Sequence, residues 1–280
     1  MDIAAEVESI YLSIKSDLSS FFARYSTDHG QPTVESFIVG NDPSAESYLR
    51  SKIRVGESLG VRVIPRRMEA DASESEIMEA ISRSSESEAV NGIMIEAPVP
   101  GHINIKRLQE SIDPEKDIDC ATSRNLGAMM KGNAQVIPAT VRSISRLLDI
   151  FNLPRGSLIT IVNRSVVIGK PLAMELLSKD YTVAVAHSKT ADLKSLCRYS
   201  AGIVVAVGSA GFLTKDYVTD KSIVVDAGIN YVEGKLKGDA DYQNLSGFVR
   251  GITPVPGGVG RLTQLYIFQN LKLILSGYMK

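Results

Sequence analysis

Short apolar runs alternate with amphipathic stretches along the first half of the chain. Three runs have the length and composition of buried strands: residues 36–39, 61–64 and 92–95. Apolar side chains at helical spacing predict helices over residues 1–26, 42–59 and 73–84. Asp42 and Ser44 are candidate N-caps of the second helix, which Gly60 ends. Because continuous apolar strands separated by helices are typical of parallel sheets, this half predicts parallel strands covered by helices.

The second half repeats this alternation more clearly. Strands are predicted at residues 158–162, 182–186, 203–207 and 223–225, and helices at 170–178 and 191–199. This is the pattern of a doubly wound unit of about the size of a dinucleotide-binding domain. A long helix over residues 140–152 lies between the halves, and an apolar helix over 262–279 ends the chain. We expect these two helices to bridge two lobes that have the active-site cleft between them.

The predicted fold class is therefore α/β with two lobes. An N-terminal αβ substrate lobe covers residues 1–138 and is completed by the C-terminal helix at 261–280. A Rossmann-type dinucleotide-binding domain covers residues 139–260. A prior of roughly 150 residues per domain also gives about two domains for a chain of 280 residues.

Composition and charge exclude several classes of function. Thirty-one Lys and Arg against 32 Asp and Glu leave a net charge of −1, which argues against nucleic-acid binding. Cys120 and Cys197 cannot form a disulfide framework or a four-cysteine zinc site, and without a Cys/His cluster we expect no metal. The acidic start lacks the features of a signal peptide, and no stretch is long enough to span a membrane. We therefore expect a cytoplasmic protein without a membrane partner.

The loop over residues 163–171 (NRSVVIGKP) is a candidate phosphate site, because it enters a helix whose N-terminal amides favour anions. Only Gly169 matches a glycine-rich fingerprint, so an ordinary strand-to-helix turn is the alternative. The next strand ends at His187 and lacks the acidic residue usual in NAD sites. Arg164, Ser188 and Lys189 would instead suit a 2′-phosphate, so a bound dinucleotide would be NADP. Helix capping is the alternative role for Ser188.

Three further loops follow the predicted strands of the second half: residues 207–211, 226–230 and 254–260. Their glycines would let backbone approach a flat ligand closely. The last loop holds two Pro and three Gly, which makes a helix-incompatible segment that leads into the final helix. A plain domain-crossing loop is the alternative.

Two places in the first half carry groups suited to acid–base chemistry. Tyr48 and Lys52 lie at i and i+4 on one helix face, and they could form an acid–base pair if Lys52 is desolvated. Glu96 ends a strand, and Asp119 follows an acidic run. A carboxylate at a strand end could bind a polar heterocycle. On spacing alone, solvated surface positions are the more common outcome for all of these groups.

Taken in order, these segments resemble a known family. Between about residues 39 and 270 the chain carries VGNDPSAESYLRSK (39–52), GIMIEAPVP (92–100), PEKDID (114–119), NLG (125–127), VNRSVVIGKP (162–171), HSKT (187–190), DAGIN (226–230), GD (238–239) and TPVPGGVG (253–260). The ordered set is similar to the motifs of the bifunctional methylenetetrahydrofolate dehydrogenase/methenyltetrahydrofolate cyclohydrolase (FolD) family. The resemblance implies oxidation of methylenetetrahydrofolate by NADP, hydrolysis of the methenyl product to the formyl form, and a homodimer formed through the cofactor lobes.

The resemblance also implies roles for single residues. Lys52 matches the acid/base residue, Tyr48 the residue that orients it, and Asp119 the carboxylate that holds the pterin. Arg164 and Ser188 match the residues that grip the 2′-phosphate. The other positions implied for cofactor binding are Asn163, Ser165, His187, Gly208 and Ile229. Those implied for folate binding, beside Tyr48, Lys52 and Asp119, are Pro256, Gly257 and Gly258.

The sequence departs from the family pattern at a catalytic position. Glu96 stands where the family has Gln, and a carboxylate there would favour a protonated Lys52. A protonated lysine is a poorer base for water attack, so we hypothesise a weakened cyclohydrolase. Milder departures are Cys120 for Gly after Asp119, and Asn163 for Gly. Two alternatives stay open: a monofunctional dehydrogenase of a related pterin such as a methanopterin, and a non-catalytic nucleotide-binding protein of the same fold.

Overall fold

The computed structural model describes residues 2–277 of the chain and divides into two compact units. One, here called the N-terminal unit, comprises Ser13–Ile137 and Ile267–Lys280; the other, the central unit, comprises Met1–Leu12 and Pro138–Tyr266. Two helices continue across the division, α1 (Ile3–His29) and α10 (Val259–Ser276). The predicted end of the last helix at residue 279 lies outside the described residues.

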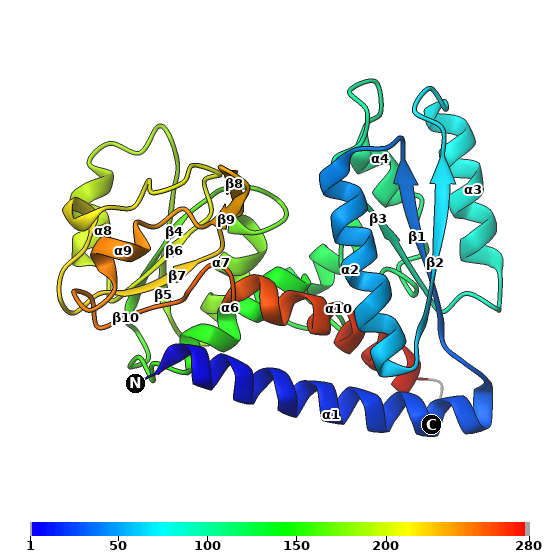
Figure 1. The fold of residues 1–280 in the computed structure, drawn as a ribbon, viewed down its shortest axis with the longest axis horizontal. Coiled ribbons are helices and arrows are strands. Elements are labelled where there is room, and N and C mark those ends of the chain that lie inside the picture. The colour runs from blue at the N-terminus through cyan, green and yellow to red at the C-terminus, as the bar shows by residue number, and fades with distance from the viewer. Residues whose placement is uncertain (1, 278–280) are drawn as a thin grey trace. The chain divides into compact units, whose positions relative to one another are not determined.

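The N-terminal unit is built on a three-stranded parallel sheet of order β2-β1-β3 (Figure 1). Its strands are β1 (Thr33–Val39), β2 (Arg62–Met68) and β3 (Gly92–Ile95). Helix α2 (Pro43–Leu59) covers the face that carries Ile38, while α3 (Glu74–Glu86) covers the face that carries Phe37. The shorter helices α4 (Ile105–Glu110) and α5 (Ser123–Met130) follow β3. The predicted parallel order of this half is confirmed.

The two helix ends that were predicted from single residues are confirmed. The Asp42 carboxylate accepts from the amides of Ser44 and Ala45 at 2.8 and 3.1 Å, which caps α2. Gly60 ends the same helix with a φ of 82°, a left-handed conformation that suits glycine. Helix α2 therefore starts and stops where local chemistry dictates, and this fixes which residues it turns toward the sheet.

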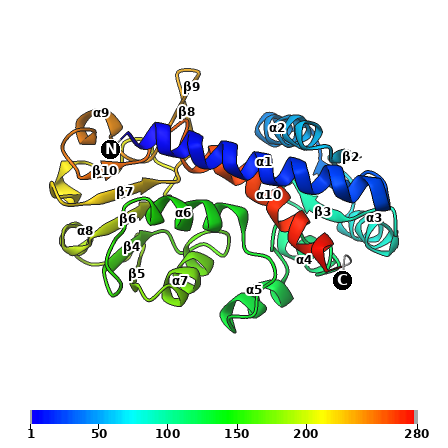
Figure 2. The ribbon, with the colours of Figure 1, turned by 90° about the horizontal axis from the view of Figure 1, so that it is seen from below.

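The central unit contains a five-stranded sheet of order β10-β7-β6-β4-β5, and every neighbouring pair in it is parallel (Figure 2). The strands are β4 (Leu158–Val162), β5 (Thr182–Ala186), β6 (Gly202–Val205), β7 (Ile223–Asp226) and β10 (Gly251–Ile252). The helices are α6 (Ala139–Asp149), α7 (Gly169–Ser178), α8 (Leu193–Tyr199), a 3-10 turn η1 (Lys215–Tyr217) and α9 (Tyr242–Leu245). A hairpin of β8 (Asn230–Val232) and β9 (Lys235–Lys237) follows β7.

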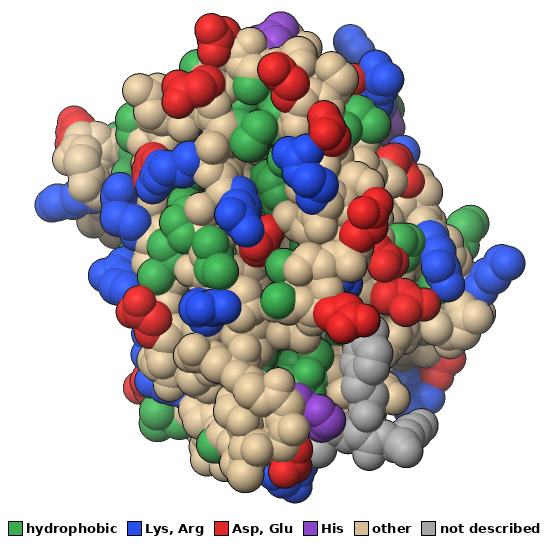
Figure 3. All heavy atoms as spheres, turned by 90° about the vertical axis from the view of Figure 1, so that its right-hand side faces the viewer, with side chains coloured by type: hydrophobic (Ala, Val, Ile, Leu, Met, Phe, Trp, Pro, Cys, Tyr) green, Lys and Arg blue, Asp and Glu red, His purple; other side chains and the backbone are tan. Residues whose placement is uncertain are grey.

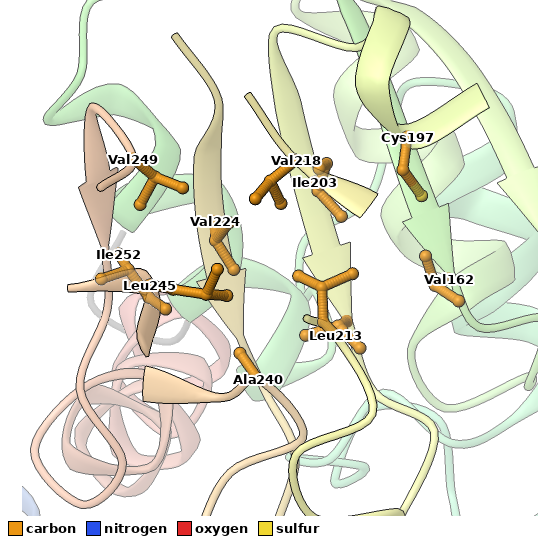
Figure 4. Packing of buried hydrophobic residues seen from close by; sticks show 11 residues of the cluster. Val162, Cys197, Ile203, Leu213, Val218, Val224, Ala240, Leu245, Val249 and Ile252 are labelled. Atoms are coloured by element: carbon orange, nitrogen blue, oxygen red, sulfur yellow. The ribbon is translucent and has the colours of Figure 1, made fainter. Parts of the chain in front are cut away.

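Buried aliphatic side chains hold the central sheet to its covering segments. One cluster joins Ile203 and Val224 of the sheet to Leu213, Val218 and Leu245 from the connections (Figure 4). Acidic and basic side chains are interspersed on the face of the molecule that Figure 3 shows, in keeping with the near-zero net charge. Within the described residues, no helix has the length and apolar character needed to cross a membrane.

Candidate active site

A buried ion pair lies at the carboxyl end of the N-terminal sheet. Glu96 directly follows β3, and its amide donates to the carbonyl of Phe37 at 2.7 Å, which continues the pairing with β1. Lys52 extends from α2, and its Nζ lies 2.9 Å from both carboxylate oxygens of Glu96. The exposed fractions of the two side chains are 13% for Lys52 and 2% for Glu96. Little solvent therefore screens this contact.

The surroundings of Lys52 favour its charged form. Burial alone would lower the pKa of Lys52, but the negative charges of Asp119 and Glu96, the hydrogen bonds that Lys52 donates to Glu96, and Tyr48 together raise that pKa above its ordinary value. Lys52 is therefore an ammonium at neutral pH. Tyr48 lies one turn before Lys52 on α2 and is half-buried, so the predicted placement of both residues on one helix face is confirmed.

Asp119 is the second carboxylate near Lys52. Burial raises the pKa of Asp119 to about 6; Lys52 opposes this rise, whereas Glu96 and Asp117 add to it. Two carboxylates thus share one ammonium in a largely desolvated place. The structure brings together all four residues that were predicted as the catalytic set: Tyr48, Lys52, Glu96 and Asp119.

A network of buried amides and carboxylates shapes the loop that carries Asp119. The Asp117 carboxylate accepts from the amides of Ala121 and Thr122 at 3.0 and 2.9 Å, and from Nδ2 of Asn125 at 3.0 Å. Nδ2 of Asn270, in α10, donates to the carbonyl of Ile118 at 2.8 Å. Asp117 and Asn125 were predicted only as members of sequence motifs, and no role was predicted for Asn270. A polar residue inside an apolar helix was the signal that could have found Asn270.

The residue after Asp119 has an unusual backbone conformation. Cys120 is 2% exposed and has a φ of 55°, in the left-handed region that favours glycine. The family pattern has Gly at this position, so the departure places a side chain where the backbone geometry disfavours one.

In the central unit, Asn163 joins the ends of two neighbouring strands. Its Oδ1 accepts from the amides of Ser165 and Gly169 at 2.8 and 3.0 Å, and its Nδ2 donates to the carbonyl of Ala206 at 2.6 Å. Since β4 and β6 lie side by side while the chain order reverses between them, this is the switch point where doubly wound sheets bind ligands. A Cβ on Gly169 would lie 2.1 Å from the carbonyl oxygen of Asn163, so only glycine fits there.

A pocket of about 310 Å³ opens at this switch point. Its lining includes four residues predicted for the cofactor, Asn163, Arg164, His187 and Ser188. Nδ1 of His187 accepts from the amide of Lys189 at 3.1 Å, which fixes the turn that carries Ser188. Capping was the alternative role for Ser188, and it is wrong, because Asp192 caps α8. The predicted cofactor residues Ser165, Gly208 and Ile229 lie in the same unit but are not among the residues that line this pocket.

Two buried carboxylates organise the neighbouring loops. Asp239 accepts from the amides of Gly208 and Ser209, each at 2.9 Å, from the amide of Val207, and from Nδ2 of Asn230 at 2.8 Å. The Asp226 carboxylate accepts from the amides of Gly228, Asp239 and Ala240. Glycine is needed at Gly228, since a Cβ there would lie 2.2 Å from the Asp239 carboxyl carbon. Asp226 and Asp239 were predicted only as members of sequence motifs.

The predicted folate residues Pro256, Gly257 and Gly258 belong to the central unit. The Val255–Pro256 bond is cis, and Gly257 has a φ of 104°. A Cβ on Gly258 would lie 2.5 Å from the carbonyl oxygen of Pro254. Residues 254–260 were predicted to be incompatible with a helix throughout; this is wrong at their end, where Val259 and Gly260 form the first turn of α10.

Comparison with known proteins agrees with both halves of this arrangement. Residues 5–119 match the tetrahydrofolate dehydrogenase/cyclohydrolase catalytic domain, and residues 138–277 match the NAD(P)-binding domain of the same enzymes. The bifunctional protein FolD of Picrophilus torridus is 44% identical over 239 residues, 85% of this chain and 86% of that protein.

Solved structures give the same result. The bifunctional dehydrogenase/cyclohydrolase of Thermoplasma acidophilum is 37% identical, covers 97% of both chains and has a TM-score of 0.90. The FolD structure of Trypanosoma brucei, a complex with NADP and an inhibitor, is 26% identical, covers 97% of this chain and 96% of its own, and has a TM-score of 0.91. The chain therefore belongs to the tetrahydrofolate dehydrogenase/cyclohydrolase family.

Proposed function

We propose that the protein oxidises 5,10-methylenetetrahydrofolate to 5,10-methenyltetrahydrofolate with NADP, and that it hydrolyses the product to 10-formyltetrahydrofolate. The observation that carries this proposal is the buried group of Lys52, Glu96 and Asp119 in the part of the chain that matches the catalytic domain. A nucleotide pocket in the part that matches the NAD(P)-binding domain supports it.

The residues of the central pocket fit a phosphorylated dinucleotide. When bound, NADP supplies the hydride acceptor. The amides of Gly169 and Lys170 at the start of α7 donate within the chain, so the positive end of this helix dipole and the loop at the switch point would hold a pyrophosphate. Arg164 and Ser188 would bind the 2′-phosphate, since no acidic residue stands at that end of β5 to repel it. The remaining proposed cofactor contacts are Ser165, His187, Gly208 and Ile229.

On the folate side, each charged group has a distinct role. Asp119, when ionised, accepts hydrogen bonds from the N–H groups of the pterin ring. Lys52 and Tyr48 orient the one-carbon unit, and the paired carboxylates offset the positive charge that develops as hydride leaves. Pro256, Gly257 and Gly258 are the further folate-binding positions of the proposal.

The hydrolysis step is slowed by Glu96. Attack of water on the methenyl carbon requires a base to take a proton. Because both oxygens of Glu96 hold the Lys52 ammonium, little free amine is present at neutral pH. The variant Glu96→Gln should therefore hydrolyse methenyltetrahydrofolate faster than the wild type, while an unchanged rate would contradict this part of the proposal.

The experiment that tests the proposed function is the formation of reduced cofactor from methylenetetrahydrofolate, measured with NADP and with NAD. We expect turnover with NADP and a much weaker reaction with NAD. Turnover with the methanopterin analogue alone would instead favour the monofunctional dehydrogenase of a related pterin. Binding of NADP without turnover of either pterin would favour the non-catalytic alternative.

We also propose a homodimer formed through the central unit. Strand β5 is an edge of its sheet, so among residues 2–277 no further strand pairs with its outer backbone groups. Val185 on β5 and Leu177 on α7, which packs beside it, are 41% and 51% exposed. An apolar sheet edge of this kind suits pairing with a second copy. We place the enzyme in the cytoplasm, where buried free thiols such as Cys120 and Cys197 are usual.

A further inference from the structure

Ser36 is a buried polar residue on the sheet face that α2 covers. It lies in the central strand β1, is 0% exposed, and points to the same side of the sheet as Ile38, which packs against Leu49 of α2. Its hydroxyl donates to Oε1 of Glu96 at 2.6 Å. This length is typical of a charge-assisted O–H···O⁻ bond.

Ser36 and Lys52 together determine how the Glu96 carboxylate is turned. Oε1 accepts from both Ser36 and Lys52, and Oε2 accepts from Lys52. The backbone of Glu96 is fixed by its bond to Phe37. Once Oε1 is held by Ser36, both oxygens face the same ammonium at 2.9 Å.

We propose that Ser36 is a positioning residue that keeps the Glu96 carboxylate turned toward Lys52, and that it thereby sets the pH at which this ion pair is lost. The inference deepens the proposed function and rests on it for its meaning in catalysis. Its geometric basis is independent of the substrate.

The other groups that act on Lys52 would remain when Ser36 is changed. They are Glu96 after β3, Asp119 in the loop after Ile118, and Tyr48 on α2, while Asp117 acts in turn on Asp119. Loss of the hydroxyl leaves the Glu96 carboxylate less well oriented, so the Lys52 ammonium should lose its proton at lower pH. The ion pair should therefore be lost at a lower pH than in the wild type.

The chain contains a matched control on the opposite face of the same strand. There Ser84 of α3 donates to Oε2 of the buried Glu35 at 2.5 Å. Glu35 follows the β1 residue Val34 and faces α3, whereas Ser36 faces α2. Ser84→Ala thus removes a hydroxyl from a buried carboxylate without touching the Lys52 site.

The test is the titration of Lys52 by NMR in protein labelled with ¹³C at the lysine Cε, with the Lys52 signal assigned from Lys52→Arg. In Ser36→Ala we expect the midpoint to fall by about one pH unit, the size of one hydrogen bond to a charged group. Ser84→Ala should leave it in place. A folded Ser36→Ala protein with the wild-type midpoint would overturn the proposal.

Repeating the titration in the Glu96→Gln variant distinguishes an effect of Ser36 on the Glu96 carboxylate from a general effect on packing. In Glu96→Gln the neutral amide has no charge for Ser36 to stabilise, so adding Ser36→Ala should leave the Lys52 midpoint unchanged. An equal shift in both backgrounds would contradict the proposal. In wild-type background, the cyclohydrolase rate at neutral pH should rise by up to about tenfold in Ser36→Ala. The titration needs no turnover. If the wild type is inactive but Ser36→Ala still lowers the Lys52 midpoint, the proposed function is refuted and the role of Ser36 is not.

Discussion

At the scale of single residues, the site holds charges where burial opposes them. Lys52 has two carboxylate neighbours, and burial shifts the pKa of Asp119 to about 6. A shift of this kind means that the ionised group opposes folding, which is common where a charge serves binding or catalysis. An ionised Asp119 therefore lowers the stability of the folded protein, although the proposed binding of the pterin requires it.

Replacing Asp119 by Asn should stabilise the protein at neutral pH. The folded-state pKa lies above the ordinary value of 3.8, so the stability linked to the protonated form is fully present below about pH 4 and is lost as the pH rises through about 6. Asp119→Asn resembles the protonated form, and at pH 7.5 its free energy of unfolding should exceed that of the wild type by about 1–3 kcal/mol. Denaturant titrations at several pH values test this. A difference that is the same at pH 4 and pH 7.5 would refute the explanation, and folate affinity should fall in the variant.

Cys120 offers a test of backbone strain next to the same carboxylate. Its φ of 55° disfavours any side chain, so glycine should be preferred over alanine there. We expect the step from Cys120→Ala to Cys120→Gly to raise the free energy of unfolding by about 1 kcal/mol. Ala128→Gly, inside helix α5, should lower it by a similar amount. Equal effects of glycine at both positions would show that position 120 is not strained.

The sequence allowed part of this site to be predicted and left part of it hidden. Helical spacing was enough to place Tyr48 and Lys52 on one face, because a 3.6-residue period is a local property. Ser36 and Asn270 were not found, because their roles depend on which strand face meets α2 and on where the last helix packs. Those are consequences of tertiary structure that no local pattern contains.

At the scale of elements, the loop after β6 at the carboxyl edge of the central sheet depends on the Asp239 carboxylate. Asp239 is 0% exposed and holds the loop after β6 through the amides of Val207, Gly208 and Ser209. The strands themselves were predictable as apolar runs, and β3, β4 and β5 have the predicted bounds. The loops were not, since glycine patterns do not say which carboxylate binds which amide.

Asp239→Ala should therefore loosen this edge of the sheet. Three amides and the Asn230 side chain would lose a charged acceptor, which should lower the free energy of unfolding by about 3–5 kcal/mol. NADP affinity, measured by calorimetric titration, should fall by about tenfold or more because the loop no longer keeps its shape. The exposed Asp220→Ala variant is the control and should be close to wild type in both properties. If Asp239→Ala is destabilised but binds NADP as tightly as the wild type, the loop after β6 does not contribute to the cofactor site.

At the scale of the whole molecule, alternating strands and helices correctly indicated two parallel αβ units. The strand order β10-β7-β6-β4-β5 and the continuation of α1 across both units could not be inferred from periodicity. Periodicity indicates which face of a helix or strand is buried, but it does not indicate which other elements pack against that face.

At this scale we predict that two copies of the chain pair through the edge strand β5. The wild type should sediment as a dimer, and Val185→Glu should shift it to a monomer, because a charge would have to be buried at the paired edge. Tyr242→Glu, on the exposed surface of α9 just before the opposite edge strand β10, should leave the dimer intact. Analytical ultracentrifugation at several concentrations gives the answer, and a monomeric wild type or a dimeric Val185→Glu would count against this interface.

The most direct test of the assignment is a single progress curve. Methylenetetrahydrofolate and NADP are mixed with enzyme, and the absorbances of the reduced cofactor and of methenyltetrahydrofolate are followed together for the wild type and Glu96→Gln. We predict that the wild type forms reduced cofactor while the methenyl compound accumulates, because Glu96 keeps Lys52 protonated, and that Glu96→Gln accumulates less of it. Absence of reduced cofactor in the wild type would contradict the dehydrogenase assignment, and equal accumulation in both proteins would contradict the role given to Glu96.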